Sequence, residues 1–158
     1  FLTEFFKKAK AEGVHTNLDT SGNPFTDQEP WHSGWLELMK YTDLVMLDIK
    51  QIDEQEHIKL TGHSNKNILA MARELSDMKK PVWIRHVLVP DGSDKDEYLH
   101  RLADFIHTLS NVERVEVLPY HTLGKFKWEN LGLSYPLEGV NPPTQERIDN
   151  ARKILGAI

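Results

Sequence analysis

Polar side chains stand near the ends of three predicted apolar strands, where they can meet a ligand. Asp19 ends the first of these strands, Asp48 and Lys50 end the second, and His121 follows the last. In parallel sheets, ligands bind at the carboxyl ends of the strands. The carboxylates can hold an amine or a cation, and the ammonium and imidazole can donate to acidic groups. These residue types favour a zwitterionic ligand.

Side-chain alternation predicts that these groups share one face of the sheet, because residues two apart in a strand point the same way. The expected sets are His15, Asn17 and Asp19; Met46, Asp48 and Lys50; and Val115, Val117 and His121. One face would then gather two carboxylates, an ammonium and an imidazole.

Each of these residues also has a purely structural interpretation. Asp48 and Lys50 can form an ion pair at a strand end, a contact of little energetic value when exposed. Asp19 can start a turn through its side chain, and His121 can be a structural histidine. Arg85 lies inside an otherwise apolar strand, where a charge is costly unless it is paired or binds something, and we favour a functional role for it.

The other histidines are expected to have no direct role. His15 and His86 are interpreted as packing or supporting residues. Surface positions are expected for His32, His57, His63, His100 and His107. No histidine belongs to a helical His-Glu-x-x-His zinc motif, and the sequence has no glycine-rich phosphate loop.

Hydrophobic periodicity predicts strands that alternate with helices. The expected strands are 14–19, 43–50, 82–89 and 112–120. The expected helices are one that ends before Gly13, a short one holding Trp35 to Met39, 65–79, one from a Ser93/Asp96 capping box to about Asn111, and a last one opened by Pro142 and Pro143. A long irregular segment follows His121. This order indicates an α/β fold with four parallel strands and flanking helices.

Composition sets the broad class of the chain. Hydrophobic residues make up 39% and charged residues 27%, which is ordinary for one globular domain, and we expect a single domain over 1–158. A net charge of −5 argues against nucleic acid as a partner. No apolar run reaches the roughly 20 residues of a membrane span. With no basic leader at the start, we expect a cytoplasmic protein that does not act on membranes.

The chain contains no cysteine. It therefore has no disulfide, no thiolate metal site and no cysteine nucleophile, and we expect no metal bound by its own residues.

Five sequence blocks resemble the pyruvate formate-lyase activating enzymes, which are glycyl-radical-enzyme activases of the radical S-adenosylmethionine family. The blocks are His15 to Gly22, Thr42 to Lys50, Val82 to Arg85 with Val89-Pro90, Leu118 to His121 with Leu123 to Lys125 and Lys127-Trp128, and Gly139-Val140 with Pro142-Pro143. Their order and spacing are shared, whereas residues 23–33 depart from the family pattern.

The resemblance implies a fold and a set of site residues. The fold is the C-terminal part of a partial (β/α)6 TIM-like barrel, strands three to six, truncated so that the N-terminal cluster-binding part is absent. The implied S-adenosylmethionine contacts are Asp48, Ile49, Lys50 and His121. The implied site for a monovalent cation is Asp19, Thr20, Met46 and Asp48. Arg85 is similar to the residue that holds the partner's glycine loop, and the segment after His121 resembles part of the docking surface.

The resemblance also implies a reaction for the intact protein. A 4Fe-4S cluster reduces S-adenosylmethionine, the resulting 5′-deoxyadenosyl radical abstracts hydrogen from a glycine of pyruvate formate-lyase, and a donor such as flavodoxin supplies the electron. The family's Cys-x-x-x-Cys-x-x-Cys motif would lie upstream of Phe1. We therefore expect this fragment to be inactive and to hold no cofactor tightly.

Two further expectations concern association and alternatives. The strand at 14–19 would be an open edge, which favours association between copies. The alternatives are an activase of another glycyl-radical enzyme and a stand-alone (β/α) metabolite-binding domain that uses Asp48, Lys50 and His121.

Overall fold

A computed structural model describes residues 1–157 and contains one four-stranded parallel sheet in the order β1-β2-β3-β4. The strands are β1 (Asn17–Thr20), β2 (Leu44–Asp48), β3 (Val82–Leu88) and β4 (Val112–Pro119). The helices are α1 (Leu2–Ala11), α2 (Trp31–Met39), α3 (Glu54–Thr61), α4 (Lys66–Asp77), α5 (Asp96–His107), α6 (Lys125–Asn130) and α7 (Gln145–Leu155). The predicted α/β class with four parallel strands is confirmed.

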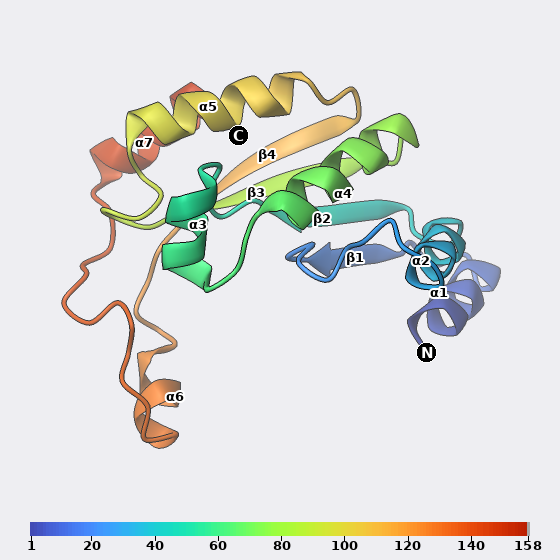
Figure 1. Ribbon diagram of the computed structural model, residues 1–158, viewed down its shortest axis with the longest axis horizontal. Helices are drawn as coiled ribbons and strands as arrows, with labels where there is room; N and C mark the ends of the chain where they lie inside the picture. Colours follow the sequence, from blue (N-terminus) through green and yellow to red (C-terminus); the bar gives the residue numbers. More distant parts are fainter. Residues whose placement is uncertain (158) are drawn as a thin grey trace.

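Helices are distributed unevenly around the sheet. Figure 1 shows α3, α4, α5 and α7 on one side of the strands, with α1 and α2 near one end of the sheet. Helix α6 lies in a segment that projects away from the sheet. The sheet therefore has a helix-covered face and an opposite face that these four helices leave uncovered; we call the latter the open face.

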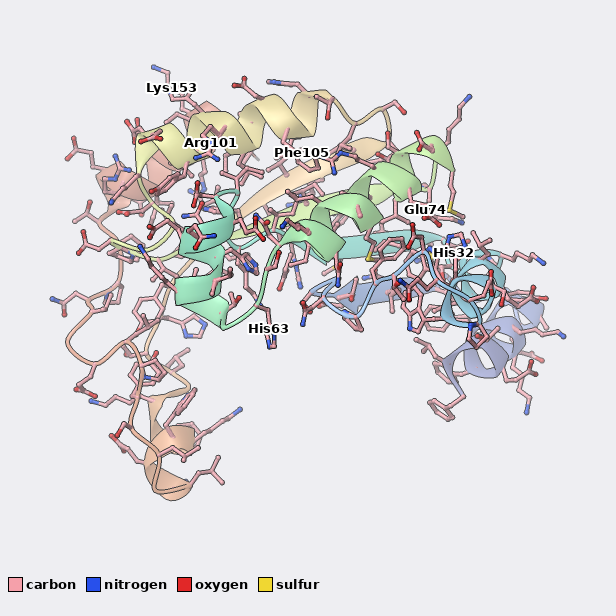
Figure 2. All side chains as sticks on the ribbon, in the orientation of Figure 1. His32, His63, Glu74, Arg101, Phe105 and Lys153 are labelled. Carbon is pink, nitrogen blue, oxygen red and sulfur yellow. The ribbon has the colours of Figure 1, made fainter. Side chains whose placement is uncertain are left out.

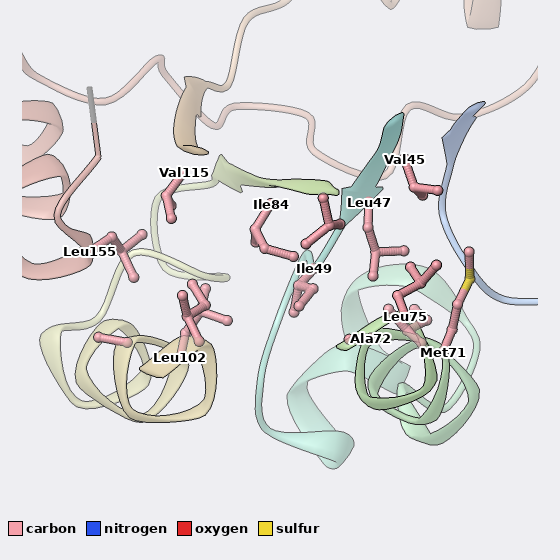
Figure 3. Close-up of a cluster of buried hydrophobic side chains, with 14 of the residues drawn as sticks. Val45, Leu47, Ile49, Met71, Ala72, Leu75, Ile84, Leu102, Val115 and Leu155 are labelled. Atoms are coloured by element: carbon pink, nitrogen blue, oxygen red, sulfur yellow. The ribbon is translucent and has the colours of Figure 1, made fainter. Parts of the chain in front are cut away.

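The hydrophobic core lies between the sheet and the helices on its covered face. Figure 3 shows Val45, Leu47 and Ile49 of the β2 segment facing Met71 and Leu75 of α4. All five side chains are at most 2% exposed. Burying an aliphatic side chain stabilises a fold by about 1.5–3 kcal/mol, so this layer holds the strands in place.

Two helices were absent from the sequence-based expectation. Helix α3 begins after Asp53, whose carboxylate accepts from Gln55 N at 3.0 Å and Glu56 N at 3.2 Å. It ends at Gly62, which has φ +80° and so takes the left-handed conformation that glycine tolerates best. Helix α6 interrupts the segment after His121 that was expected to be irregular.

The predicted capping box at Ser93 and Asp96 is wrong. Helix α5 begins after Lys95, and no side chain caps its first turn. Ser93 is fully buried instead. Its hydroxyl donates to Val87 O at 2.6 Å and accepts from Val89 N at 2.9 Å, so it fastens the chain as it leaves β3.

The predicted side-chain alternation is wrong for β4. Val115 pairs with the core residue Ile84, and both Val115 and Val117 belong to the core cluster on the covered face. Glu116, the partner of Arg85, points to the open face. Strand β4 ends at Pro119, so His121 lies beyond the alternating pattern.

Strand β1 lies at one edge of the sheet, as the sequence predicted, although it begins at Asn17 rather than at Val14. The other edge strand, β4, packs against α7. No helix among residues 1–157 is long and apolar enough to cross a membrane.

Candidate functional site

Three charged side chains meet on the open face, where the carboxyl ends of β1 and β2 lie beside the middle of β3. Asp48 is the register partner of Arg85, and Asp19 pairs with Met46 one strand further out. Arg85 donates from Nε to Asp48 Oδ1 at 2.8 Å, and its Nη2 lies at the same distance from that oxygen. Nη2 also donates to Asp19 Oδ1. The guanidinium thus joins the two carboxylates.

Burial makes this arrangement energetically important. The Arg85 side chain is 15% exposed and that of Asp48 is 17% exposed. Burial alone would lower the pKa of Arg85, but the carboxylates of Asp48 and Asp19 outweigh it and raise the pKa. Arg85 therefore stays charged, and of the two roles that the sequence left open for it, the structure shows the paired one.

Lys50 lies beside Asp48, and its ammonium donors are free to bind a ligand. Its Nζ lies 3.8 Å from Asp48 Oδ2, an ion-pair distance that is too long for a hydrogen bond. Asp48 and Lys50 also line a hollow of about 170 Å³ at the ends of β1 and β2. We call it the strand-end hollow.

The other two residues of the implied cation site have local roles in this structure. Thr20 Oγ1 accepts from Gly22 N at 3.0 Å and so fixes the turn that follows β1. Met46 Sδ lies 2.9 Å from Asn17 Nδ2. No group of three or more histidine, aspartate or glutamate side chains in the described part of the chain is arranged to hold a metal ion.

Gly22 keeps this turn close to the core. It has φ +69°, and a Cβ at this position would approach Leu47 Cδ1 to 3.0 Å and Met71 Sδ to 3.2 Å. Any larger residue would push the turn away from α4, which is why a glycine is required here.

Ile49 lies between Asp48 and Lys50 but faces the core. Its side chain is fully buried. Its N–H donates to Arg85 O at 2.9 Å, and its carbonyl accepts a hydrogen bond from His86 Nδ1 at 2.8 Å. His86 is itself buried, as expected for a packing residue, and this burial lowers its pKa.

His121 does not share the strand-end hollow with Lys50. It is exposed and lines a different hollow, together with Val87 of β3 and the end of β4. The structure therefore brings Asp19, Asp48, Lys50 and Arg85 together and leaves His121 on the far side of β3.

Sequence reasoning missed part of the hollow's wall. His57, expected on the surface, is 2% exposed and lines the hollow with His63, Ser21 and Asn23. The expectation for His57 is wrong because α3 was not predicted. His57 Nδ1 lies 2.6 Å from His63 O, so this nitrogen carries the proton and donates. The Asp53 cap was the signal that could have located α3.

His32 also differs from a free surface residue. It is half-buried, and its Nε2 lies 2.7 Å from Glu74 Oε1 of α4; Figure 2 shows the two side chains side by side. This contact ties part of the segment at 23–33 to α4.

Comparisons with curated sequences find relatives that carry one name. No protein-family model matches the chain. A pyruvate formate-lyase-activating enzyme from Streptococcus mutans is 54% identical over 155 residues, which are 98% of this chain and 59% of that relative.

Two solved structures share the fold. A crystal structure of a domain of pyruvate-formate lyase-activating enzyme from Bacteroides vulgatus matches with a TM-score of 0.78 at 22% identity, covering 99% of this chain and 84% of that one. A radical SAM methyltransferase from Sphaerobacter thermophilus matches with a TM-score of 0.61 at 17% identity, covering 92% and 39%.

The chain spans about three fifths of the length of the curated relatives it matches. Sequence identity above 50% along nearly all of its residues confirms the expected resemblance: the chain is homologous to part of the pyruvate formate-lyase-activating enzymes.

Proposed function

We propose that this chain provides the S-adenosylmethionine-binding and partner-binding part of an enzyme that generates a glycyl radical on pyruvate formate-lyase. The observation that carries this proposal is the cluster of Asp19, Asp48, Lys50 and Arg85 on neighbouring strands of a chain homologous to such enzymes.

The residues present fit S-adenosylmethionine. The strand-end hollow offers the ammonium of Lys50, which makes no hydrogen bond among residues 1–157, and the open Oδ2 of Asp48. In the proposal Asp48, Lys50 and His121 contact the cofactor, and Ile49 fixes the backbone between the first two. When bound, S-adenosylmethionine supplies the radical chemistry, and the protein supplies binding and orientation.

The residues present do not fit a 4Fe-4S cluster. Such clusters are held by cysteine thiolates, and this chain has no cysteine. The cluster belongs to the proposal only as a part of the intact enzyme outside these 158 residues, together with its electron donor, such as flavodoxin.

Arg85 has two roles in the proposal. In this structure its guanidinium joins Asp19 and Asp48. We propose that it turns to hold the partner's glycine loop, and that a monovalent cation at Asp19, Thr20, Met46 and Asp48 then replaces its charge. Two carboxylates at neighbouring strand ends repel one another unless a positive charge stays between them, so the exchange keeps the site balanced.

The test uses the complete gene product, reconstituted anaerobically with iron and sulfide and mixed with S-adenosylmethionine, a reductant and pyruvate formate-lyase. Electron paramagnetic resonance should detect a glycyl radical on the lyase. Lys50→Met should reduce the radical yield at least about tenfold, the effect of losing about 1.4 kcal/mol of binding. Lys59→Met is the matched control, because Lys59 lies on the exposed side of α3 and pairs with Glu56 there.

Two results would contradict the proposal. One is a complete product that assembles a cluster and yields no radical on pyruvate formate-lyase. The other is equal radical yield from the Lys50 and Lys59 variants. The 158-residue chain by itself should yield no radical.

A further inference from the structure

Four polar side chains line the strand-end hollow without a hydrogen-bond partner among residues 1–157. They are Ser21, Asn23, Lys50 and His63. Ser21 and Asn23 follow β1, Lys50 follows β2, and Figure 2 shows His63 projecting from the turn between α3 and α4. A hydroxyl, an amide, an ammonium and an imidazole can all donate to one anionic group.

The backbone is anchored at two of these four positions, Asn23 and His63. The Asn23 carbonyl accepts from Asn67 Nδ2 of α4 at 3.1 Å. The His63 carbonyl accepts from His57 Nδ1 at 2.6 Å, and His63 N donates to Thr61 Oγ1 at 3.3 Å. At these two positions a ligand has to order only the side chain and not the backbone, which reduces the entropy cost of binding.

The charges of the hollow are paired in a way that suits one end of an amino acid. Asp48 uses Oδ1 for Arg85, which leaves Oδ2 for a cation, and Lys50 Nζ stands 3.8 Å from that oxygen. The ammonium of an amino acid can bind the Asp48 carboxylate, and the neighbouring carboxylate of the same amino acid can bind the Lys50 ammonium.

The hollow is large enough for the small end of a ligand. Its volume of about 170 Å³ is many times the roughly 10–15 Å³ that one bound water molecule requires. The amino-acid end of a ligand fits this volume, and a larger group attached to it can extend from the hollow into solvent.

We propose that Ser21, Asn23 and His63 complete, with Lys50, a carboxylate-binding subsite for the α-amino-acid end of a ligand. The inference rests on the proposed function where the ligand is S-adenosylmethionine, and it adds three residues to the site implied by resemblance. Asn23 belongs to the segment at 23–33 that departs from the family pattern, so the subsite also assigns that segment a role in ligand selection.

The subsite can be tested on the 158-residue chain by nuclear magnetic resonance, with L-methionine as the probe. Methionine should shift the imidazole signals of His63 in a saturable way. L-methioninol, which lacks the carboxylate, should bind at least about tenfold more weakly. Acetate, a free carboxylate without the amine, should also bind more weakly than methionine.

Variants assign the effect to the named side chains. His63→Val and Asn23→Ala should each weaken methionine binding about three- to tenfold, which corresponds to the loss of one hydrogen bond to a charged group. His107→Val, an exposed histidine of α5, is the matched control and should leave binding unchanged. Amide spectra of all variants show whether the fold is retained.

The outcomes separate this inference from the proposed function. If Lys50→Met abolishes methionine binding while both His63→Val and Asn23→Ala leave it intact, the added subsite is wrong and the proposed function stands. If Lys50→Met has no effect either, both fail. Acetate binding as tight as methionine, or no methionine binding to the chain, would overturn the amino-acid assignment.

Discussion

The two faces of the sheet differ in what they bury. On the covered face, Leu47 and Ile84 are fully buried among apolar side chains from α4 and α5. On the open face, Asp48 and Arg85, their neighbours along the same two strands, form an ion pair and stay partly exposed. Successive side chains of a strand point to opposite faces of the sheet. A residue that stabilises the core can therefore be the direct sequence neighbour of a residue that binds a ligand.

The difference shows how stability and function are divided in this chain. The covered face gains free energy from apolar area removed from water. The open face gains little net stability from its charges, because each buried charge is costly unless another charge balances it. A set of balanced charges at the strand ends is thus better explained by binding than by folding.

The largest expected effect comes from breaking the covered face. Leu47→Ala should lower the free energy of unfolding by about 2–5 kcal/mol, because it removes fully buried atoms and leaves a cavity. Met46→Ala, one residue away and half-buried on the open face, should cost clearly less. Urea unfolding of both variants measures the contrast. Equal losses would show that the two faces do not differ in packing.

Breaking the ion pair of the open face should have a smaller effect. Arg85→Met leaves two carboxylates without their shared donor and should cost about 1–3 kcal/mol. The matched control is Arg114→Met on the same face, where Arg114 lies over the Trp83 ring and 3.0 Å from Glu116. This pair is more exposed than that of Arg85 and Asp48, so its loss should cost less, about 0–1 kcal/mol, and urea unfolding compares the two variants.

The pH dependence of stability tests whether His86 is buried in the covered face. Because burial lowers the pKa of His86 below its ordinary value of 6.5, the unfolded chain binds a proton more readily than the folded chain as the pH falls below that value. Stability should therefore fall as the pH drops below about 6.5, by up to about 1.4 kcal/mol per pH unit. His86→Gln should remove this part of the slope in urea unfolding at several pH values. The exposed His107→Gln should keep it.

The smallest effect on stability concerns the edges of the sheet. Strand β1 is an edge, and we expect copies of the chain to associate through it as the concentration rises. Asn17→Lys places a charge on this exposed edge position and should reduce the association. Glu113→Lys on β4, the edge that packs against α7, should not. Light scattering measures the mass, and a monomer at all concentrations would contradict the expectation.

The sequence predicted the fold class because the apolar stripes are strong and regularly spaced. Helix α4 presents Ile68, Met71, Ala72 and Leu75 to the core, a spacing that belongs only to a helix. Helix α3 was missed because its sequence carries no apolar stripe, and in the structure its only buried residue is His57. The residues that could have predicted this helix are its two caps, Asp53 and Gly62.

The candidate site was predicted in part. Strand ends located Asp19, Asp48 and Lys50, because the ends of parallel strands converge in any such sheet. The pairing of Arg85 with both acids depends on the register between strands, which no pattern within one strand specifies. The walls formed by Asn23 and His63 depend on where loops return, and His121 was placed by an alternation that stops at Pro119.

The charge balance at the strand ends has a kinetic consequence. Asp19, Asp48, Lys50 and Arg85 are two acids and two bases within one small region, so beyond about 8–10 Å their fields largely cancel in physiological salt. These four side chains therefore add little to the field that a distant ion meets. The site itself should then contribute little to the ionic-strength dependence of the association rate, and its selection among ligands should arise in how long each one stays.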